Sequence, residues 1–160
     1  EAEMCGNGIR SFAKYLYDNR LIRKKTVDIE TAAGIKKLVL NVSGSRVRSV
    51  VVNMGAPILQ REMIPMIGRP GMVINEALRL DDGSSFDITA ISMGNPHLVV
   101  FVEDIDKFPL EKYGPLLEHH PLFPNRTNVE FVKVISRSEI FQRTWERGTG
   151  ETLSCGGRPG

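Results

Sequence analysis

The sequence predicts an α+β fold made of two pseudo-symmetric halves, incomplete in this chain. Each half is expected to be a curved, mostly antiparallel, barrel-like sheet around a central helix. Three observations support this expectation: a helical stripe near the start, apolar residues that alternate over most of the remaining chain, and a Cys-Gly turn near each end. We divide the chain into an N-terminal half, residues 1–56, and a C-terminal half, residues 57–160, that stops just after the second Cys-Gly turn.

The N-terminal half begins with a predicted helix. Its apolar residues recur at the spacing of an amphipathic helix, and residues 18–20 close it: Ile9, Phe12, Ala13, Leu16 and Tyr17. The period then changes to two in residues 27–31, 38–42 and 50–52, with turn residues between these runs. An antiparallel meander is therefore expected after the helix.

The C-terminal half opens with residues 58–71, which show no clear period and are interpreted as a crossing or linker between the halves. Strands are expected at 86–93 and 97–102, after turns at 81–83 and 94–96. A helix is predicted over 110–119, interrupted by Gly114-Pro115. Residues 128–135 and 139–145 then predict a hairpin around 136–138.

Composition points to a globular domain with a small-molecule partner. The chain has 21 basic and 19 acidic residues and 41% apolar residues, so no one-sided charge favours nucleic acid or a membrane surface. No apolar run reaches the length of a membrane helix, and no signal peptide precedes the first turn. We expect a cytoplasmic protein with two reduced thiols, and a homodimer is one candidate assembly.

The two cysteines, Cys5 and Cys155, each precede glycine in a turn. Backbone N–H groups at a helix N-terminus bind anions and favour a thiolate there. A buried cysteine that caps a helix is the simpler interpretation of the Cys5 turn taken alone. Together the two turns suggest a racemase or epimerase, in which one thiolate removes a proton and the opposite thiol donates one. A hydrolase would instead need a nucleophile beside a base such as histidine.

Four segments, in order and spacing, resemble the diaminopimelate epimerase family: EAEMCGNGIR at 1–10, MGNPH at 93–97, NVEF at 128–131, and the stretch from WERG to the second Cys-Gly at 145–156. The resemblance covers essentially the whole chain. It implies a cofactor-independent isomerase that interconverts LL- and meso-diaminopimelate, for lysine and peptidoglycan synthesis, without a metal site.

The resemblance also implies the roles of individual residues. Cys5 and Cys155 would be the catalytic acid and base. The remaining residues would bind substrate, the first four at the reacting centre and the others chiefly at the distal amino-acid end: Gly6, Asn7, Gly156, Gly157, Asn95, Asn128, Glu146 and Arg147. The family usually has threonine or serine where this sequence has Gly157. Because the family continues at both ends, we expect residues 1–160 alone to be poorly stable and inactive.

Structural interpretations of the same residues remain open. Asn95 or Asn128 could simply form a turn, and Glu146 and Arg147 could be a solvent-exposed ion pair without a binding role. His97 could be a structural histidine with satisfied hydrogen bonds. His119 and His120 are interpreted as a pair at a helix end, and Trp145 as a core residue. Alternative functions are a proline or hydroxyproline racemase, a non-catalytic amino-acid-binding module, and a redox-regulated protein whose two thiols form a disulfide.

Overall fold

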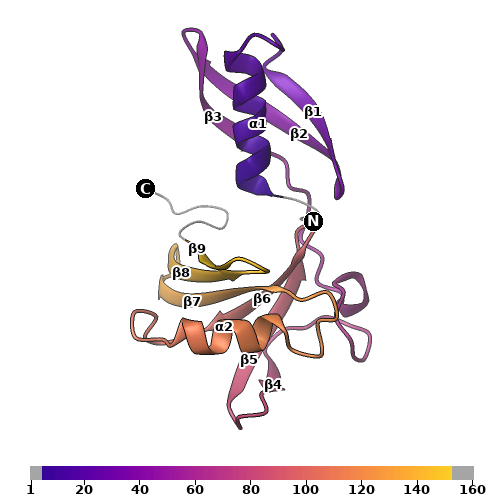
Figure 1. Ribbon diagram of the computed structural model, residues 1–160, viewed down its shortest axis with the longest axis vertical. Helices are drawn as coiled ribbons and strands as arrows, with labels where there is room; N and C mark the ends of the chain where they lie inside the picture. The colour runs from indigo at the N-terminus through magenta and orange to yellow at the C-terminus, as the bar shows by residue number, and fades with distance from the viewer. Residues whose placement is uncertain (1–4, 153–160) are drawn as a thin grey trace. The chain divides into compact units, whose positions relative to one another are not determined.

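The computed structural model describes residues 5–152. The chain divides into two compact units, residues 1–56 and residues 57–160, called unit 1 and unit 2 below. Both contain helix and mostly antiparallel sheet, so the predicted α+β class is confirmed (Figure 1). Among the described residues, no helix is long and apolar enough to cross a membrane.

Unit 1 packs one helix against a three-stranded meander. Helix α1 covers Gly6–Asp18, and strands β1, β2 and β3 cover Thr26–Thr31, Gly34–Ser43 and Arg46–Val52. The strands pair antiparallel in the order β1-β2-β3, as the alternation predicts. The small core joins the helix to the sheet and contains Ile9, Ala13, Leu38, Leu40 and Val47.

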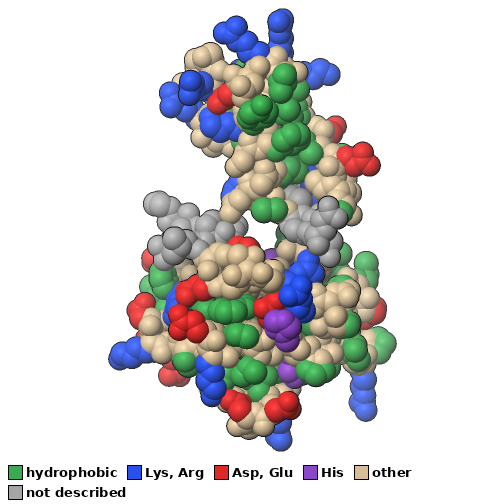
Figure 2. All heavy atoms as spheres, viewed as in Figure 1, with side chains coloured by type: hydrophobic (Ala, Val, Ile, Leu, Met, Phe, Trp, Pro, Cys, Tyr) green, Lys and Arg blue, Asp and Glu red, His purple; other side chains and the backbone are tan. Residues whose placement is uncertain are grey.

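Helix α1 is only partly covered within the described residues. Phe12, at the edge of the predicted apolar stripe, is 50% exposed, and Tyr15 is 59% exposed. Figure 2 shows hydrophobic side chains along this side of the helix. Phe12 lies about 60° from the centre of the predicted apolar stripe, which is consistent with this exposure.

The end of α1 is tied to β3 through Asp18. One carboxylate oxygen accepts the N–H of Val47 at 2.8 Å, and the other accepts the Lys14 ammonium at 2.7 Å. Both donors lower the pKa of Asp18 below its usual value. The Lys14 ammonium also donates to the carbonyl of Val47. These contacts fix the C-terminal turn of the helix on the sheet.

Unit 2 contains a six-stranded sheet in the order β4-β5-β6-β7-β8-β9. Its strands cover Glu76–Arg79, Ser85–Ser92, Pro96–Phe101, Asn128–Ser136, Glu139–Glu146 and Gly150–Thr152. All neighbours pair antiparallel except β6 and β7, which are parallel. A parallel pair needs a crossover, and here it contains α2, Leu110–Glu118. The strands predicted from alternation are confirmed, whereas three-residue β9 was missed.

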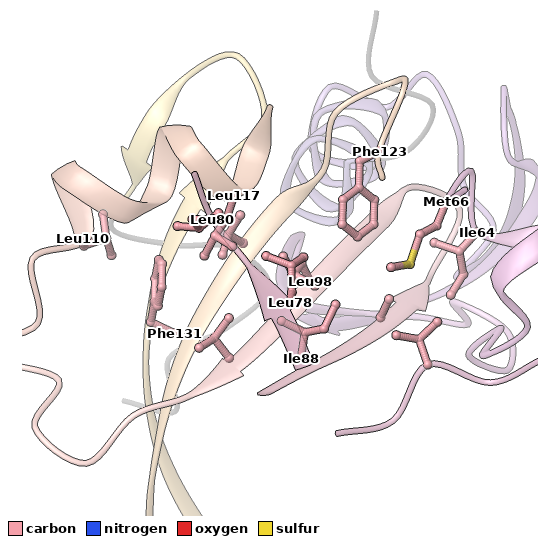
Figure 3. Close-up of a cluster of buried hydrophobic side chains, with 14 of the residues drawn as sticks. Ile64, Met66, Leu78, Leu80, Ile88, Leu98, Leu110, Leu117, Phe123 and Phe131 are labelled. Atoms are coloured by element: carbon pink, nitrogen blue, oxygen red, sulfur yellow. The ribbon is translucent and has the colours of Figure 1, made fainter. Parts of the chain in front are cut away.

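The core of unit 2 lies between α2 and the sheet. Leu110 and Leu117 of α2 point toward side chains of the sheet such as Leu98 and Phe131 (Figure 3). Ile64 and Met66 are buried in the same cluster. The prediction that residues 58–71 form a linker is therefore wrong. This segment contains the short 3-10 helix η1, Arg61–Met63, and its apolar side chains help to close the core.

Helix α2 passes through Gly114 and Pro115 without the expected interruption. Gly114 is needed for packing, because a Cβ atom there would lie 2.5 Å from Cδ2 of Trp145. The indole ring thus lies directly against the helix backbone. Trp145 belongs to the margin of the core, as its structural interpretation predicts.

Replacing Gly114 with alanine tests this close approach. Overpacking against Trp145 should lower the free energy of unfolding by about 1–3 kcal/mol. Helix propensity alone would instead raise it by about 1 kcal/mol. Chemical denaturation of Gly114→Ala, beside the exposed control Glu111→Ala on the same helix, distinguishes the two effects; a stabilised Gly114→Ala variant would contradict the packing.

The turn between β4 and β5 is joined to α2 by an ion pair. Asp82 accepts the Lys112 ammonium at 2.8 Å and the Ser84 N–H at 2.9 Å. Lys112 also lies over the Tyr113 ring, 4.4 Å from its centre. Lys112 and Ser84 lower the pKa of Asp82 from 3.8 to about 2.

A lowered carboxyl pKa stabilises the folded state above 3.8, and this contribution disappears as the pH falls toward about 2. We therefore expect Asp82→Asn to lower the melting temperature near neutral pH, and this difference to shrink across that acidic interval. Thermal melts at a series of pH values measure it, with Asp81→Asn as the control. A difference that does not change with pH would argue against the ion pair.

Candidate active site

Cys5 is the N-cap of α1, so its thiol lies at the positive end of the helix. Its backbone is extended, with φ −128° and ψ 108°, and its Sγ accepts the Gly8 N–H at 3.3 Å. The residue is exposed. The cysteine therefore caps the helix, as its structural interpretation predicts, but the burial expected in that interpretation is wrong, because the residue is exposed.

Gly6 and Asn7 form the first helical residues after this cap. A Cβ atom at Gly6 would meet no atom of the described part of the chain within 4 Å, so these residues leave the backbone there open to a ligand. At Gly8 a Cβ atom would lie 3.4 Å from Sγ of Cys5. The Asn7 side chain accepts a hydrogen bond from Arg10 one turn later. The turn thus combines an exposed thiol with the first backbone N–H groups of a helix.

In unit 2, the predicted binding residues gather at one end of the sheet. His97 at the start of β6 pairs in register with Asn128 at the start of parallel β7. Val129 pairs with Trp145 near the end of antiparallel β8, so Glu146 lies beside Asn128. Asn95 precedes β6 by one residue. Four of the sequence-predicted residues are therefore brought together by this strand order: Asn95, Asn128, Glu146 and Arg147.

Asn128 is buried and bonded to the backbone on both sides. Its Nδ2 donates to the carbonyl of Pro96 at 3.0 Å, and its Oδ1 accepts the Arg147 N–H at 3.0 Å. It therefore links the start of β6 to the turn after β8. This side chain fixes the geometry of the site, whatever else it contacts.

Asn95 is held by a chain of two polar residues. The His97 ring bridges Asn95 and Glu130: its Nε2 lies 2.9 Å from Asn95 Oδ1, and its Nδ1 lies 2.7 Å from Glu130 Oε1, both at hydrogen-bond distance. Glu130 is buried, and its second carboxylate oxygen has no hydrogen-bond partner among residues 5–152. The structural interpretation of His97 is confirmed. Glu130 was missed as part of the site, although an acidic residue inside the apolar run 129–134 was a usable signal.

The turn that follows β8 carries Glu146 and Arg147. Glu146 accepts the Thr152 hydroxyl at 2.7 Å, and the Arg147 guanidinium donates to the carbonyl of Asn125 at 3.2 Å. Gly148 has a φ of +77°, which favours glycine, and the Thr149 N–H closes the turn on the carbonyl of Glu146 at 3.0 Å. Both charged side chains therefore start from a fixed backbone rather than a free loop.

The second cysteine turn, Cys155, Gly156 and Gly157, lies outside the described residues. Cys5, Gly6 and Asn7 belong to unit 1, and the four residues at the sheet end belong to unit 2. His119 and His120 follow the end of α2, as expected for a helix-end pair, and bond to main-chain groups: His119 to the carbonyl of Pro115, and His120 to the Leu122 N–H and the carbonyl of Arg79 in β4. Within residues 5–152, no three metal-ligating side chains are grouped around a common point.

Comparison with known proteins identifies the family. The family model for diaminopimelate epimerase matches residues 1–60 and 89–157, which include both cysteine turns and every segment described above. The chain belongs to the diaminopimelate epimerase family. The segment between the two matched ranges contains η1, the edge strand β4 and the start of β5, and none of the sequence-predicted site residues.

Curated diaminopimelate epimerases align with nearly all of this chain. The protein of Moorella thermoacetica is 52% identical over 156 residues, 98% of this chain and 56% of that protein. The protein of Pelotomaculum thermopropionicum is 53% identical, over 98% of this chain and 55% of its own length. The chain therefore spans about half the length of the curated relatives it matches.

Solved structures share the fold at low sequence identity. A probable proline racemase from Agrobacterium radiobacter has a TM-score of 0.71 at 14% identity, over 93% of this chain and 47% of that one. A hydroxyproline epimerase from Agrobacterium vitis has a TM-score of 0.71 at 17% identity, over 93% of this chain and 46% of that one. These matches extend the diaminopimelate epimerase relationship to a wider fold group.

Asn128→Asp tests the bonding of this member of the epimerase family. An aspartate can still accept the Arg147 N–H, but it has no donor for the carbonyl of Pro96. We expect the free energy of unfolding to fall by about 1–3 kcal/mol. Chemical denaturation measures this loss, with exposed Asn41→Asp as the matched control. Equal stabilities of the two variants would show that the Asn128–Pro96 contact contributes nothing.

Proposed function

We propose that this chain carries the active-site residues of a diaminopimelate epimerase, an isomerase that interconverts the LL and meso forms without a cofactor. The observation that carries this proposal is family membership across both cysteine turns, supported by about 50% identity to curated epimerases. The accessible thiol of Cys5 at the N-terminus of α1 is consistent with it. The cytoplasm, where thiols stay reduced, is the compartment that suits this chemistry.

The proposed reaction needs two thiol groups on opposite faces of one α-carbon. The thiolate of one cysteine removes the α-proton and becomes a thiol, leaving a carbanion. The thiol of the other cysteine donates its proton to the opposite face and becomes a thiolate. No net proton is gained or lost, and the configuration of the carbon is inverted. Cys5 and Cys155 are the residues we assign to these roles.

The carbanion requires stabilisation, because an amino-acid α-proton is very weakly acidic. N–H donors fixed before the reaction stabilise developing charge more effectively than water does. We assign the reacting carboxylate to backbone groups of Gly6 and Asn7 and, in the second turn, Gly156 and Gly157. The open space over Gly6 supports the first part of this assignment.

The distal amino-acid end of the substrate is assigned to the sheet end of unit 2. A guanidinium binds a carboxylate through two parallel hydrogen bonds, which makes Arg147 the candidate partner of the distal carboxylate. Glu146 is the candidate partner of the distal ammonium, while Asn95 and Asn128 complete the polar surroundings. A substrate with a single amino-acid end would leave such groups unpaired, which disfavours it.

Replacing either cysteine tests the two-thiol reaction. In the complete polypeptide that carries these residues, Cys5→Ala and Cys155→Ala should each lower kcat by about 10²–10⁴-fold, the usual contribution of one acid or base. Epimerisation of LL-diaminopimelate and deuterium uptake from D₂O are the measurements. Ser11→Ala, an exposed change on α1, is the control and should keep full activity.

The same assays separate the alternatives. Turnover of proline or hydroxyproline without turnover of diaminopimelate would show that the proposed substrate is wrong. The fold shared with a proline racemase and a hydroxyproline epimerase is the reason for including these two amino acids. Binding of diaminopimelate without deuterium uptake would favour a non-catalytic module. A disulfide between Cys5 and Cys155 in the active protein, detected by mass spectrometry before and after reduction, would exclude their acid and base roles.

A further inference from the structure

The last turn of α2 places a carboxylate beneath the turn that carries Glu146 and Arg147. The side chain of Glu118 is only 4% exposed, and none of the roles proposed above uses it. Burying a carboxylate is costly unless several donors surround it. The identity of those donors therefore shows what this residue holds in place.

Each oxygen of Glu118 accepts hydrogen bonds from a residue next to the charged pair. Oε2 accepts Nε1–H of Trp145 at 2.7 Å, and Oε1 accepts the backbone N–H of Gly148 at 2.8 Å. Oε1 also accepts the Arg126 guanidinium at 3.3 Å. Trp145 immediately precedes Glu146, and Gly148 immediately follows Arg147. One carboxylate thus fixes both ends of the two-residue segment.

The same helix also fixes the Trp145 ring through Gly114, one turn before Glu118. Their spacing of four places both residues on one side of α2. Gly114 allows the ring to lie against the helix, where a Cβ atom would approach it to 2.5 Å, and Glu118 binds the polar edge of that ring. The orientation of Trp145 is therefore set by α2 twice, once by shape and once by hydrogen bonding.

Arg147 itself is held from the other side by residues of unit 2. Its N–H donates to Asn128 Oδ1 at 3.0 Å, and its guanidinium donates to the carbonyl of Asn125 at 3.2 Å. Contacts to Glu118 and Asn128 therefore fix three features within residues 145–148: the indole of Trp145, the backbone of Arg147 and the backbone of Gly148. The direction in which Glu146 and Arg147 leave the sheet depends on these contacts.

We propose that Glu118 is a positioning residue for the Glu146–Arg147 pair, setting the affinity for the distal end of the substrate without touching it. This inference rests on the proposed function. Side chains held in the binding geometry before the substrate arrives lose less freedom on binding. Loss of Glu118 should therefore weaken substrate binding more than it slows proton transfer, which is assigned to other residues.

Glutamine is the informative substitution, because it keeps the size of Glu118 and removes one acceptor. Its amide nitrogen would face an N–H donor, from either Trp145 or Gly148, and two donors repel each other. Glu111→Gln provides the matched control, since Glu111 is an exposed glutamate in the first turn of the same helix.

The experiment measures steady-state kinetics and melting temperature of the complete polypeptide with diaminopimelate. Glu118→Gln should raise KM by about ten- to hundredfold, the size of effect that misplaced binding groups produce, and change kcat by less than about threefold. Glu111→Gln should leave both constants unchanged. A Glu118→Gln variant with a lower melting temperature but an unchanged KM would overturn the proposal, because its role would then be structural only.

A second variant tests the specific contact and guards against simple misfolding. Trp145→Phe removes the indole donor, so the glutamine nitrogen in Glu118→Gln/Trp145→Phe no longer faces it. The double variant should have a KM closer to that of Trp145→Phe than to that of Glu118→Gln. Strictly additive effects on KM would overturn this coupling.

The two proposals fail in different ways. An unmodified polypeptide that does not epimerise diaminopimelate refutes the function, and the positioning role with it. An active unmodified polypeptide whose KM is insensitive to Glu118→Gln refutes only the positioning role. The NMR resonances of the Gly148 amide and the Trp145 indole N–H should shift in Glu118→Gln but not in Glu111→Gln, which verifies that the intended contacts were broken.

Discussion

The parallel pairing of β6 and β7 is the constraint on which the candidate site in unit 2 depends. Because the two strands run in the same direction, Asn95 and His97 begin one strand where Asn128 begins the other. The antiparallel strand β8 then ends at the same edge and delivers Glu146 and Arg147. A parallel pair cannot be closed by a tight turn, so the chain must cross over, and the crossover supplies α2. The parallel direction of β6 and β7 and the presence of α2 between them therefore depend on each other.

Burial of polar groups makes this arrangement specific. Asn128 and Glu118 are both buried, and each bonds to main-chain or indole groups from other elements. Leaving such a group unpaired would cost about 1–3 kcal/mol, so a shifted register of β8 or a displaced α2 is disfavoured. The same contacts that define the fold in this region also orient the charged pair at its edge. Stability and the proposed substrate recognition thus depend on the same few buried side chains.

Unit 1 organises its reactive group by simpler, local means. Cys5 is the N-cap, and its sulfur accepts an N–H from the first turn of the helix that it begins. Asp18 and Lys14 fix the other end of that helix on β3. A thiol placed this way needs few long-range contacts. This explains why a short motif, Cys5-Gly6-Asn7-Gly8, was sufficient to identify the helix start from sequence.

The sequence by itself determined the features that depend on neighbouring residues: α1 and its cap, the meander of unit 1, most strands of unit 2 and the family. Periodicity records which face of an element is apolar, and turn residues record where it ends. Only the tertiary structure decided the parallel pairing of β6 with β7, the burial of residues 58–71, and the contacts of Glu118 and Glu130. These depend on which distant segments meet, and one-dimensional periodicity carries no information about that.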